Sequence, residues 1–240
     1  MRIINFAKRN FKELIRDPLS IVFTIIIPLF LLFIFQQINI PSEAYNVENF
    51  TPGIVVFGLT FVTLFTATLI ANDRKSSFLI RLGISPMKPH EYILGYTLSV
   101  LPIILLQDIL FFALAMILGL SFSLNMIFTI LASLIVSILF IMLGILIGSL
   151  TSEKGASGLG SMIVQLVVFT SGMYFSTEMM GDFMNTICNI LPFKPGLNIV
   201  RDVLNGASLD IKDIIIFSIY TVILIIISNI VFKKKMTNDK

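Results

Sequence analysis

The side chain with the clearest capacity for chemistry is Asp108, because it is the one ionisable residue deep inside a long apolar stretch. Burying a carboxylate in such a segment is costly unless it is protonated or hydrogen-bonded, so we expect Asp108 to face the protein interior. The polar residues available as neighbours are Gln107, Ser133, Ser137 and Gln165. Two roles are open: Asp108 lines a polar path that meets a cationic substrate, or its carboxyl group fixes helix packing. The candidate path residues are Gln107, Asp108, Gln165 and Ser171.

The sequence lacks the residues of several common catalytic and binding sites. One His and one Cys cannot supply the pairs that a metal site needs, and neither a Gly-x-x-x-x-Gly-Lys-[Ser/Thr] phosphate loop nor a Gly-x-Ser-x-Gly nucleophile elbow occurs. We expect His90 to be a solvated loop residue and Cys188 to be a small apolar residue on a packed face. The sequence therefore predicts no metal, no bound cofactor and no catalytic residue on this chain.

The elements that must position these residues are six apolar stretches of bilayer length. They run approximately over 19–38, 53–71, 93–118, 126–149, 156–175 and 213–232. About 20 helical residues at 1.5 Å each cross a hydrocarbon core of roughly 30 Å, and a segment in lipid must satisfy its own backbone, so helices are expected. With 56% apolar and 13% charged residues, the chain is predicted to form one all-α, polytopic transmembrane domain over residues 1–240.

The positive charges lie mostly on one side of these stretches. The segments before the first stretch, after the second and fourth, and after the last contain 14 of the 17 Lys and Arg residues. By the positive-inside rule this side is the cytoplasm, so both termini, including the tail 233–240, are expected inside a multi-pass protein of a bacterial plasma membrane. The net charge of +3 then reflects topology, and no nucleic-acid partner is expected.

The first 17 residues are predicted to form an amphipathic helix. Residues 2–16 place apolar side chains on one helical face, and the basic residues elsewhere include Lys8, Arg9, Lys12 and Arg16. Such a helix lies in the cytoplasmic interface, in contact with membrane lipid. Asp17-Pro18 then makes an elbow, because Pro restricts the residue before it and can begin the next helix. Pro28 predicts a kink inside the first span.

The connection 72–91 differs from a plain loop. Residues 72–82 can form a short charged helix with Phe78 and Leu82 on one face, and Ser85-Pro86 stops it. A charged helix with an apolar stripe suits docking to a soluble partner protein. It equally suits a helix that rests on lipid headgroups, and the residues themselves leave both alternatives open.

The segment 176–205, on the opposite side, is predicted to contain two short helices. Its apolar stripe through Met179 and Phe183 is too short to span a membrane, so the first helix should lie at, or re-enter, the outer boundary. Pro192 and Pro195-Gly196 end this helix, and a second one through Val200 follows.

Small residues predict close helix packing in two spans. Gly144 and Gly148 are four residues apart, and residues 155–161 open the fifth span with Gly, Ala and Ser. Such spacing lets helix backbones approach closely. The third and fourth spans are joined by few residues, so they are expected to pack as an antiparallel pair.

Three groups of residues occur in a recognisable order. They are FKELIRDPLS at 11–20 with IPLF at 27–30; DRK at 73–75 with RL at 81–82, SP at 85–86 and EYILG at 91–95; and SGMYF at 171–175 with LPF at 191–193 and RDVLNG at 201–206. In this order they resemble the permeases of type-2 ATP-binding-cassette (ABC-2) transporters, over essentially the whole chain.

This resemblance implies a six-span half-transporter that dimerises with a second permease subunit, identical or different, and works with a separate ATPase subunit. That partner would hold ATP and Mg. The loop between spans 2 and 3 looks like the coupling helix that sits in a groove of the ATPase, which here comprises Arg74, Lys75, Ser77, Phe78, Arg81, Leu82, Ser85 and Pro86. The family's loop usually opens with a Glu-Arg or Arg-Glu pair, whereas this one opens with Asp73-Arg74-Lys75. Segment 176–205 would form the external gate, with Met179, Phe183 and Pro192.

The resemblance favours export by rigid-body movement, in which ATP closes the ATPase dimer and the two permease halves rearrange around a central path. The path candidates are largely apolar or hydroxyl-bearing, which suits a hydrophobic or amphipathic cargo such as a drug, an antimicrobial peptide or a lipid-like compound. Export of polysaccharide or sodium is an alternative within the family. From other classes, a membrane-embedded lipid transferase and a non-transporting immunity protein are alternatives.

Overall fold

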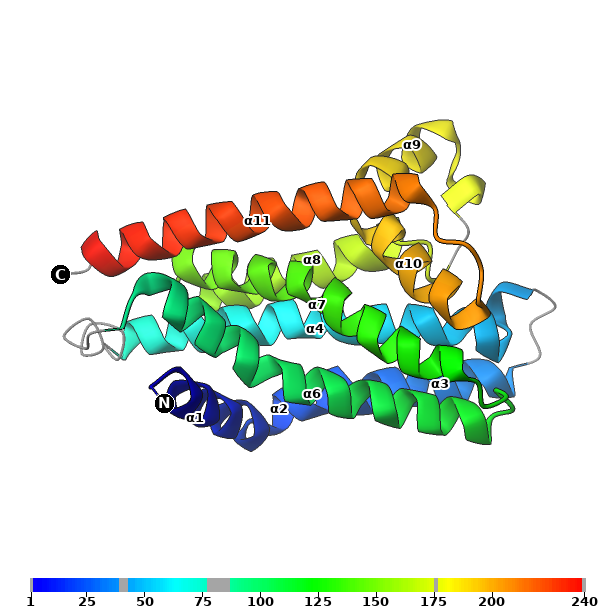
Figure 1. Ribbon diagram of the computed structural model, residues 1–240, viewed down its shortest axis with the longest axis horizontal. Helices are drawn as coiled ribbons and strands as arrows, with labels where there is room; N and C mark the ends of the chain where they lie inside the picture. The colour runs from blue at the N-terminus through cyan, green and yellow to red at the C-terminus, as the bar shows by residue number, and fades with distance from the viewer. Residues whose placement is uncertain (1, 39–42, 77–86, 175–176, 239–240) are drawn as a thin grey trace.

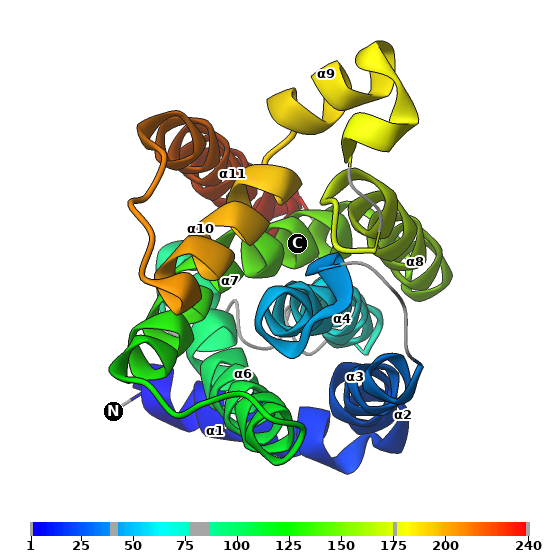
Figure 2. The same ribbon diagram turned by 90° about the vertical axis from the view of Figure 1, so that its right-hand side faces the viewer.

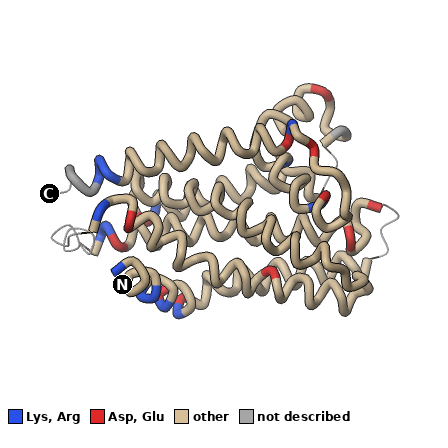
Figure 3. Tube along the Cα trace, in the orientation of Figure 1, with Lys and Arg blue, Asp and Glu red and all other residues tan. Residues whose placement is uncertain are grey.

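Long apolar helices run side by side along the molecule (Figure 1). The computed structural model describes residues 2–38, 43–76, 87–174 and 177–238, and the elements in these residues are all helical. The two ends of the chain lie at the same end of the bundle, where most of the Lys and Arg residues are found (Figure 3). We call this the basic end and define it by residues 2–16, 72–76, 153–154 and 233–235.

Five helical segments of the described chain are long and apolar enough to cross a membrane. They are Pro18–Gln37 (α2, η1 and α3), Val47–Lys75 (α4), Pro89–Ile117 (α6), Leu124–Leu150 (α7) and Ile211–Lys235, which belongs to α11 (Ile211–Asn238). The all-α membrane architecture predicted from the sequence is therefore confirmed.

The fifth predicted span, 156–175, is not among these segments. It corresponds to α8 (Glu153–Thr170), which has 18 residues. Glu153 and Lys154 in its first turn, followed by several Gly and Ser residues, make α8 less apolar than these five segments. Even so, α8 runs along the bundle and packs against α4 and α7 (Figures 1 and 2).

The amphipathic helix at the start of the chain is α1 (Arg2–Arg16), and it packs mainly on α6. The ring of Phe6 meets Tyr92 and Tyr96 edge-on, with ring centroids 5.4 and 5.0 Å apart. Asp17 then ends α1 and caps α2 (Pro18–Ile21), because its carboxylate accepts hydrogen bonds from the backbone of Leu19 and the hydroxyl of Ser20. The predicted elbow at Asp17-Pro18 is thus present.

The helix that follows the elbow is irregular near Pro28. A π-helical turn, η1 (Val22–Ile26), separates α2 from α3 (Ile27–Gln37), and Pro28 lies in the first turn of α3. Pro cannot donate a backbone hydrogen bond and crowds the carbonyl four residues earlier, which a wider preceding turn accommodates. A π-helical turn thus lies next to Pro28, where the sequence predicted a kink.

Helix α4 occupies the middle of the bundle, as the end-on view shows (Figure 2). It begins at Val47, within a stretch whose polar and turn-forming residues suggest a loop, and it continues to Lys75. It packs closely on α7, since a Cβ atom added to Gly148 would lie 2.5 Å from the carbonyl oxygen of Ala67, and one added to Gly144 would lie 2.7 Å from Thr66. The close packing predicted for this glycine pair is confirmed.

The far end of the bundle, opposite the basic end, contains the shorter elements. They are η2 (Glu43–Tyr45), η3 (Thr177–Met180), α9 (Asp182–Ile190) and α10 (Phe193–Asn205). Helix α10 lies across the ends of α4, α7 and α11 and buries Leu197 and Val200, whereas α9 projects outward (Figure 2). The two short helices expected in 176–205 are thus present, with α10 beginning at Phe193.

Candidate functional site

The basic end of α4 has a buried ionic cluster at Asp73. This carboxylate is only 1% exposed, and its two oxygens accept hydrogen bonds of 2.7 and 2.9 Å from Nη1 of Arg9 on α1. The hydroxyl of Tyr96 on α6 donates a third, at 2.7 Å. One side chain near the end of α4 therefore holds two neighbouring helices.

Arg9 is itself fixed by residues of its own helix. Its guanidinium donates to Oδ1 of the buried Asn10 at 2.7 Å and forms an ion pair of 2.6 Å with Glu13. Burial raises the pKa of Glu13 above its usual value of 4.5, against the lowering effect of the Arg9 guanidinium. The orientation of α1 is therefore linked to Asp73 through a connected polar network.

The next two residues of α4 contact two further helices at this end, α7 and α8. Nη1 of Arg74 donates to the carbonyl oxygens of Gly148, Ser149 and Thr151, at 3.2, 2.7 and 3.2 Å, and so satisfies carbonyl groups at the C-terminal end of α7. Nζ of Lys75 pairs with Glu153 of α8 at 2.6 Å.

We call Asp73, Arg74 and Lys75 the α4 clamp. These three consecutive residues reach α1, α6, α7 and α8. Asp73 directly precedes the expected coupling segment, and Arg74 and Lys75 are its first members; its remaining expected residues, Ser77, Phe78, Arg81, Leu82, Ser85 and Pro86, lie outside the described residues.

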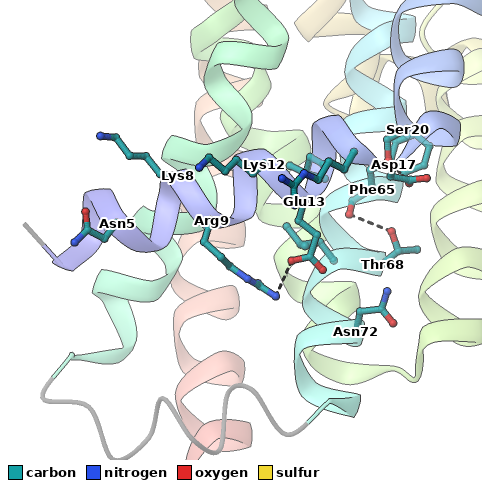
Figure 4. Close-up of a pocket in the computed structure, with 13 residues that line it drawn as sticks. Asn5, Lys8, Arg9, Lys12, Glu13, Asp17, Ser20, Phe65, Thr68 and Asn72 are labelled. Carbon is teal, nitrogen blue, oxygen red and sulfur yellow. Dashed lines mark hydrogen bonds and ion pairs between the residues drawn. The ribbon is translucent and has the colours of Figure 1, made fainter.

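A groove of about 870 Å³ lies between α1 and the basic end of α4 (Figure 4). We call it the basic vestibule; its lining includes Lys8, Arg9, Lys12, Glu13, Arg16, Asp17, Phe65, Thr68 and Asn72. Figure 4 shows Arg9 and Glu13 pointing toward each other, while Lys8 and Lys12 extend from α1. All four residues expected on the basic face of the elbow helix thus border one groove.

A second groove, of about 790 Å³, continues from the vestibule along the bundle. We call it the long groove; it is lined by residues of α2, η1, α4 and α8 and by Tyr174 toward the far end. Asp17, Phe65, Thr68 and Asn72 line both grooves. Most of the long groove's walls are aromatic or aliphatic, and α8 adds the exposed polar residues Ser157, Ser161 and Gln165.

Asp108 lies away from both grooves, in the packed interior. It is fully buried, and the hydroxyl of Ser133 on α7 donates a hydrogen bond to its carboxylate. The amide of Gln107 donates to Asp108 at 3.4 Å and to the carbonyl oxygen of Val55 at 3.5 Å. Among the polar neighbours expected for Asp108, the structure therefore brings Gln107 and Ser133 to it, and it places Gln165 elsewhere.

The other expected path and gate residues lie in different surroundings. Ser171 is buried, and its hydroxyl has no hydrogen-bond partner among the described residues. Met179 and Phe183, near and on α9, are 83% and 78% exposed, whereas Pro192 is buried just before α10. The expected path residues are thus not brought into one site.

Polar contacts also order the far end, in a way that the sequence patterns do not indicate. Nζ of Lys194 on α10 donates to Thr177 at 2.7 Å, to Asn189 at 2.7 Å and to Asn185 at 3.3 Å. These contacts tie η3, α9 and α10 together. Tyr45 adds a hydrogen bond of 2.6 Å to the carbonyl oxygen of Tyr174.

Sequence reasoning missed Tyr96 and Glu153 as partners of the α4 clamp. Both belong to recognisable helices, but the identity of a partner across a bundle leaves no periodic signal. Within the described ranges, no group of three or more His, Cys, Asp or Glu residues is placed to hold a metal ion.

Comparison with known proteins complements this geometry. The family profile described as ABC-2 type transporter matches residues 2–205, which is most of the chain. No curated protein matches the sequence.

Proposed function

Because the chain belongs to the ABC-2 type transporter family and is a membrane permease, we propose that it exports a hydrophobic or amphipathic substrate. Permeases of this family pair with ATP-binding-cassette ATPase subunits. In our proposal such a partner binds ATP and Mg, while this chain supplies the path. The observation that supports it best is the α4 clamp, which links the expected coupling segment to four helices of the bundle.

The clamp suggests how movement passes between the subunits. Closure of the ATPase dimer would displace the segment 77–86, and Asp73, Arg74 and Lys75 would carry that displacement into α4 and its neighbours. Packed helices move as bodies between discrete arrangements, since interfaces of this kind are not continuously deformable. In this role the Arg74 guanidinium acts mainly on α7, and the ATPase-facing surface comes from the residues after it.

We also propose six spans, with α8 as the fifth. Its 18 residues extend about 27 Å, close to the roughly 30 Å of a hydrocarbon core, and it runs along the bundle beside α4. Six crossings place both termini on one side. The gathering of Lys and Arg at the basic end supports a cytoplasmic location for that side (Figure 3).

The long groove is the better candidate for the path. Ser157, Ser161 and Gln165 are exposed on α8. If α8 spans the membrane, contact between these polar side chains and lipid is unfavourable. A second permease copy, identical or different, would cover this face and enclose the groove. The apolar walls suit a drug, an antimicrobial peptide or a lipid-like compound; polysaccharide and sodium are alternatives with less support from such walls.

At the far end, we assign η3, α9 and α10 to the external gate. Met179 and Phe183 expose large apolar surfaces beside α9, which fits contact with the outer membrane boundary or with the second copy. Pro192 sits at the junction of α9 and α10. Re-entry of these helices into the membrane belongs to this proposal.

The proposal is tested by isolating the tagged chain from its own membrane and identifying any ATPase that co-purifies. Charge reversal at Arg74 and Arg81 should release that ATPase or abolish its coupling to transport. Because Arg74 also contacts α7, the folded fraction of each variant is measured first. Charge reversal at Lys233 and Lys234, at the same end of the bundle, serves as the control. Retained co-purification and full transport in the Arg74/Arg81 variant would contradict the assignment.

A further inference from the structure

The basic vestibule has positive charge that the protein itself leaves unmatched. Lys8, Lys12 and Arg16 recur every four residues on α1, are exposed, and have no hydrogen-bond or ion-pair partner among the described residues. Side chains at this spacing lie on one helical face. With Arg9, these residues bring four cations to a groove that only two carboxylates, those of Glu13 and Asp17, line.

Among the described residues, the carboxylates that line or lie near the vestibule have partners other than these three cations. Glu13 pairs with Arg9, and Asp17 accepts hydrogen bonds from Leu19 and Ser20. Asp73 is held by Arg9 and Tyr96, and Glu153 by Lys75. The vestibule is thus available to an anion supplied from outside the chain.

The vestibule is continuous with an apolar surface of very different character. Asp17, Phe65, Thr68 and Asn72 line both it and the long groove, whose further walls include Phe57, Phe61, Leu64, Val164 and Val168. A molecule lying across this junction would meet cations at one end and aromatic and aliphatic side chains at the other. Asp108, the acid that suggested a cationic cargo, does not line either groove.

We propose that the cargo is an anionic amphiphile, whose negative head occupies the basic vestibule at Lys8, Lys12 and Arg16 and whose apolar tail lies in the long groove. This inference rests on the proposed export function, since it names the substrate class of the same path. Charge attraction brings the head to the membrane interface, and burial of the tail against α4 and α8 stabilises it there. Neither the anionic head nor the apolar tail of the cargo is expected to bind well without the other.

The probe for the test is dodecyl phosphate with a photoreactive diazirine in its tail, applied to the full chain in phosphatidylcholine nanodiscs. Labelled positions are identified by mass spectrometry. Three competitors separate head from tail: unlabelled dodecyl phosphate, dodecyltrimethylammonium with the same tail and opposite charge, and inorganic phosphate. We expect labels on α4 and α8 at the long groove and competition by dodecyl phosphate alone.

Two pairs of variants locate the contacts. Neutralising Lys8, Lys12 and Arg16 to Gln should lower labelling at least tenfold, whereas neutralising Lys233, Lys234 and Lys235 removes as much charge from the same end and should change it less than twofold. Ser161→Trp fills the long groove and should abolish labelling. Met162→Trp, on the exposed face of the same helix, should not.

Several results would overturn the proposal. Equal competition by dodecyltrimethylammonium would mean that the head charge is not recognised, and equal competition by inorganic phosphate would mean a simple anion site. Labels confined to α1 would show that its basic face anchors lipid headgroups. Because labelling needs no ATPase, failure here is distinguishable from failure of the export function, which is judged by co-purification of the ATPase.

Discussion

Replacing Asp73 by Asn is the sharpest single test of the α4 clamp, because it removes one charge and hardly changes the volume. Breaking a fully buried ion pair costs about 3–5 kcal/mol, but the side chain of Arg9 is 36% exposed, so solvent screens part of the interaction. Hydrogen bonds to charged groups contribute about 1.5–3 kcal/mol, and Asn can still accept one from Tyr96. We expect Asp73→Asn to lower the free energy of unfolding by about 2 kcal/mol.

The assay uses the chain's single Cys as a native reporter. Cys188 is fully buried, so a thiol-reactive dye becomes fluorescent only when the protein opens. A loss of about 2 kcal/mol corresponds to a midpoint lower by roughly 4–8 °C on the scale for domains of this size. Arg9→Gln should have a similar effect, and the double variant should be less destabilised than the sum of the two, by about 1–2 kcal/mol.

Two controls separate the clamp from general effects of charge. Asp213→Asn alters a carboxylate that accepts a hydrogen bond of 2.7 Å from Asn198 at the far end, outside the clamp, and its effect should add fully to that of Arg9→Gln. Lys75→Gln breaks an exposed ion pair and should cost at most about 1 kcal/mol. Full additivity between Asp73→Asn and Arg9→Gln would refute the link between α1 and α4.

Three further predictions concern packing, pH and the path. Gly148→Ala should destabilise the fold by about 1–3 kcal/mol, because its Cβ would lie 2.5 Å from a backbone oxygen of α4, whereas Gly158→Ala, with no atom within 4 Å of its added Cβ, should be neutral or stabilising in the same dye assay. Burial raises the folded-state pKa of Glu13 above its unfolded-state value near 4.5. The stability that this shift contributes is therefore complete below the unfolded-state pKa and is lost as pH rises through the folded-state pKa. Over that pH interval, a series of unfolding midpoints should show the wild type losing stability relative to Glu13→Gln. Asp108→Asn should retain stimulation of the partner ATPase by dodecyl phosphate, and Gln165→Leu, on the long groove, should reduce it; the opposite ranking would return Asp108 to the path.

Much of the architecture could be predicted because its causes are local in the sequence. Apolar length indicates spans, the Asp17-Pro18 pair indicates the elbow, and the spacing of Gly144 and Gly148 indicates close packing; the structure shows all three features. The predicted span 156–175 corresponds to α8, which is not among the five candidate spans. Its Gly and Ser residues lower its apolar character, although its length suits a span.

The partners of the polar residues were harder to predict, because they depend on how the helices are rotated and paired. Arg9 and Asp73 are 64 residues apart, and no periodic pattern relates them. Gln165 and Asp108 both belong to apolar stretches, yet one faces a groove and the other the interior. Asp73 belongs to the predicted cytoplasmic connection 72–91, but α4 extends to Lys75 and places Asp73 in a buried position.

In the proposed mechanism, the α4 clamp couples this permease to a separate ATPase. The most direct measurement is ATP hydrolysis by the co-purified ATPase in nanodiscs with the wild-type chain, with Asp73→Asn and with the control Asp213→Asn. We predict that the ATPase co-purifies with all three chains, and that its stimulation by dodecyl phosphate is lost with Asp73→Asn alone. The claim would be contradicted if no ATPase co-purified with the wild type, or if Asp73→Asn supported the same stimulated rate.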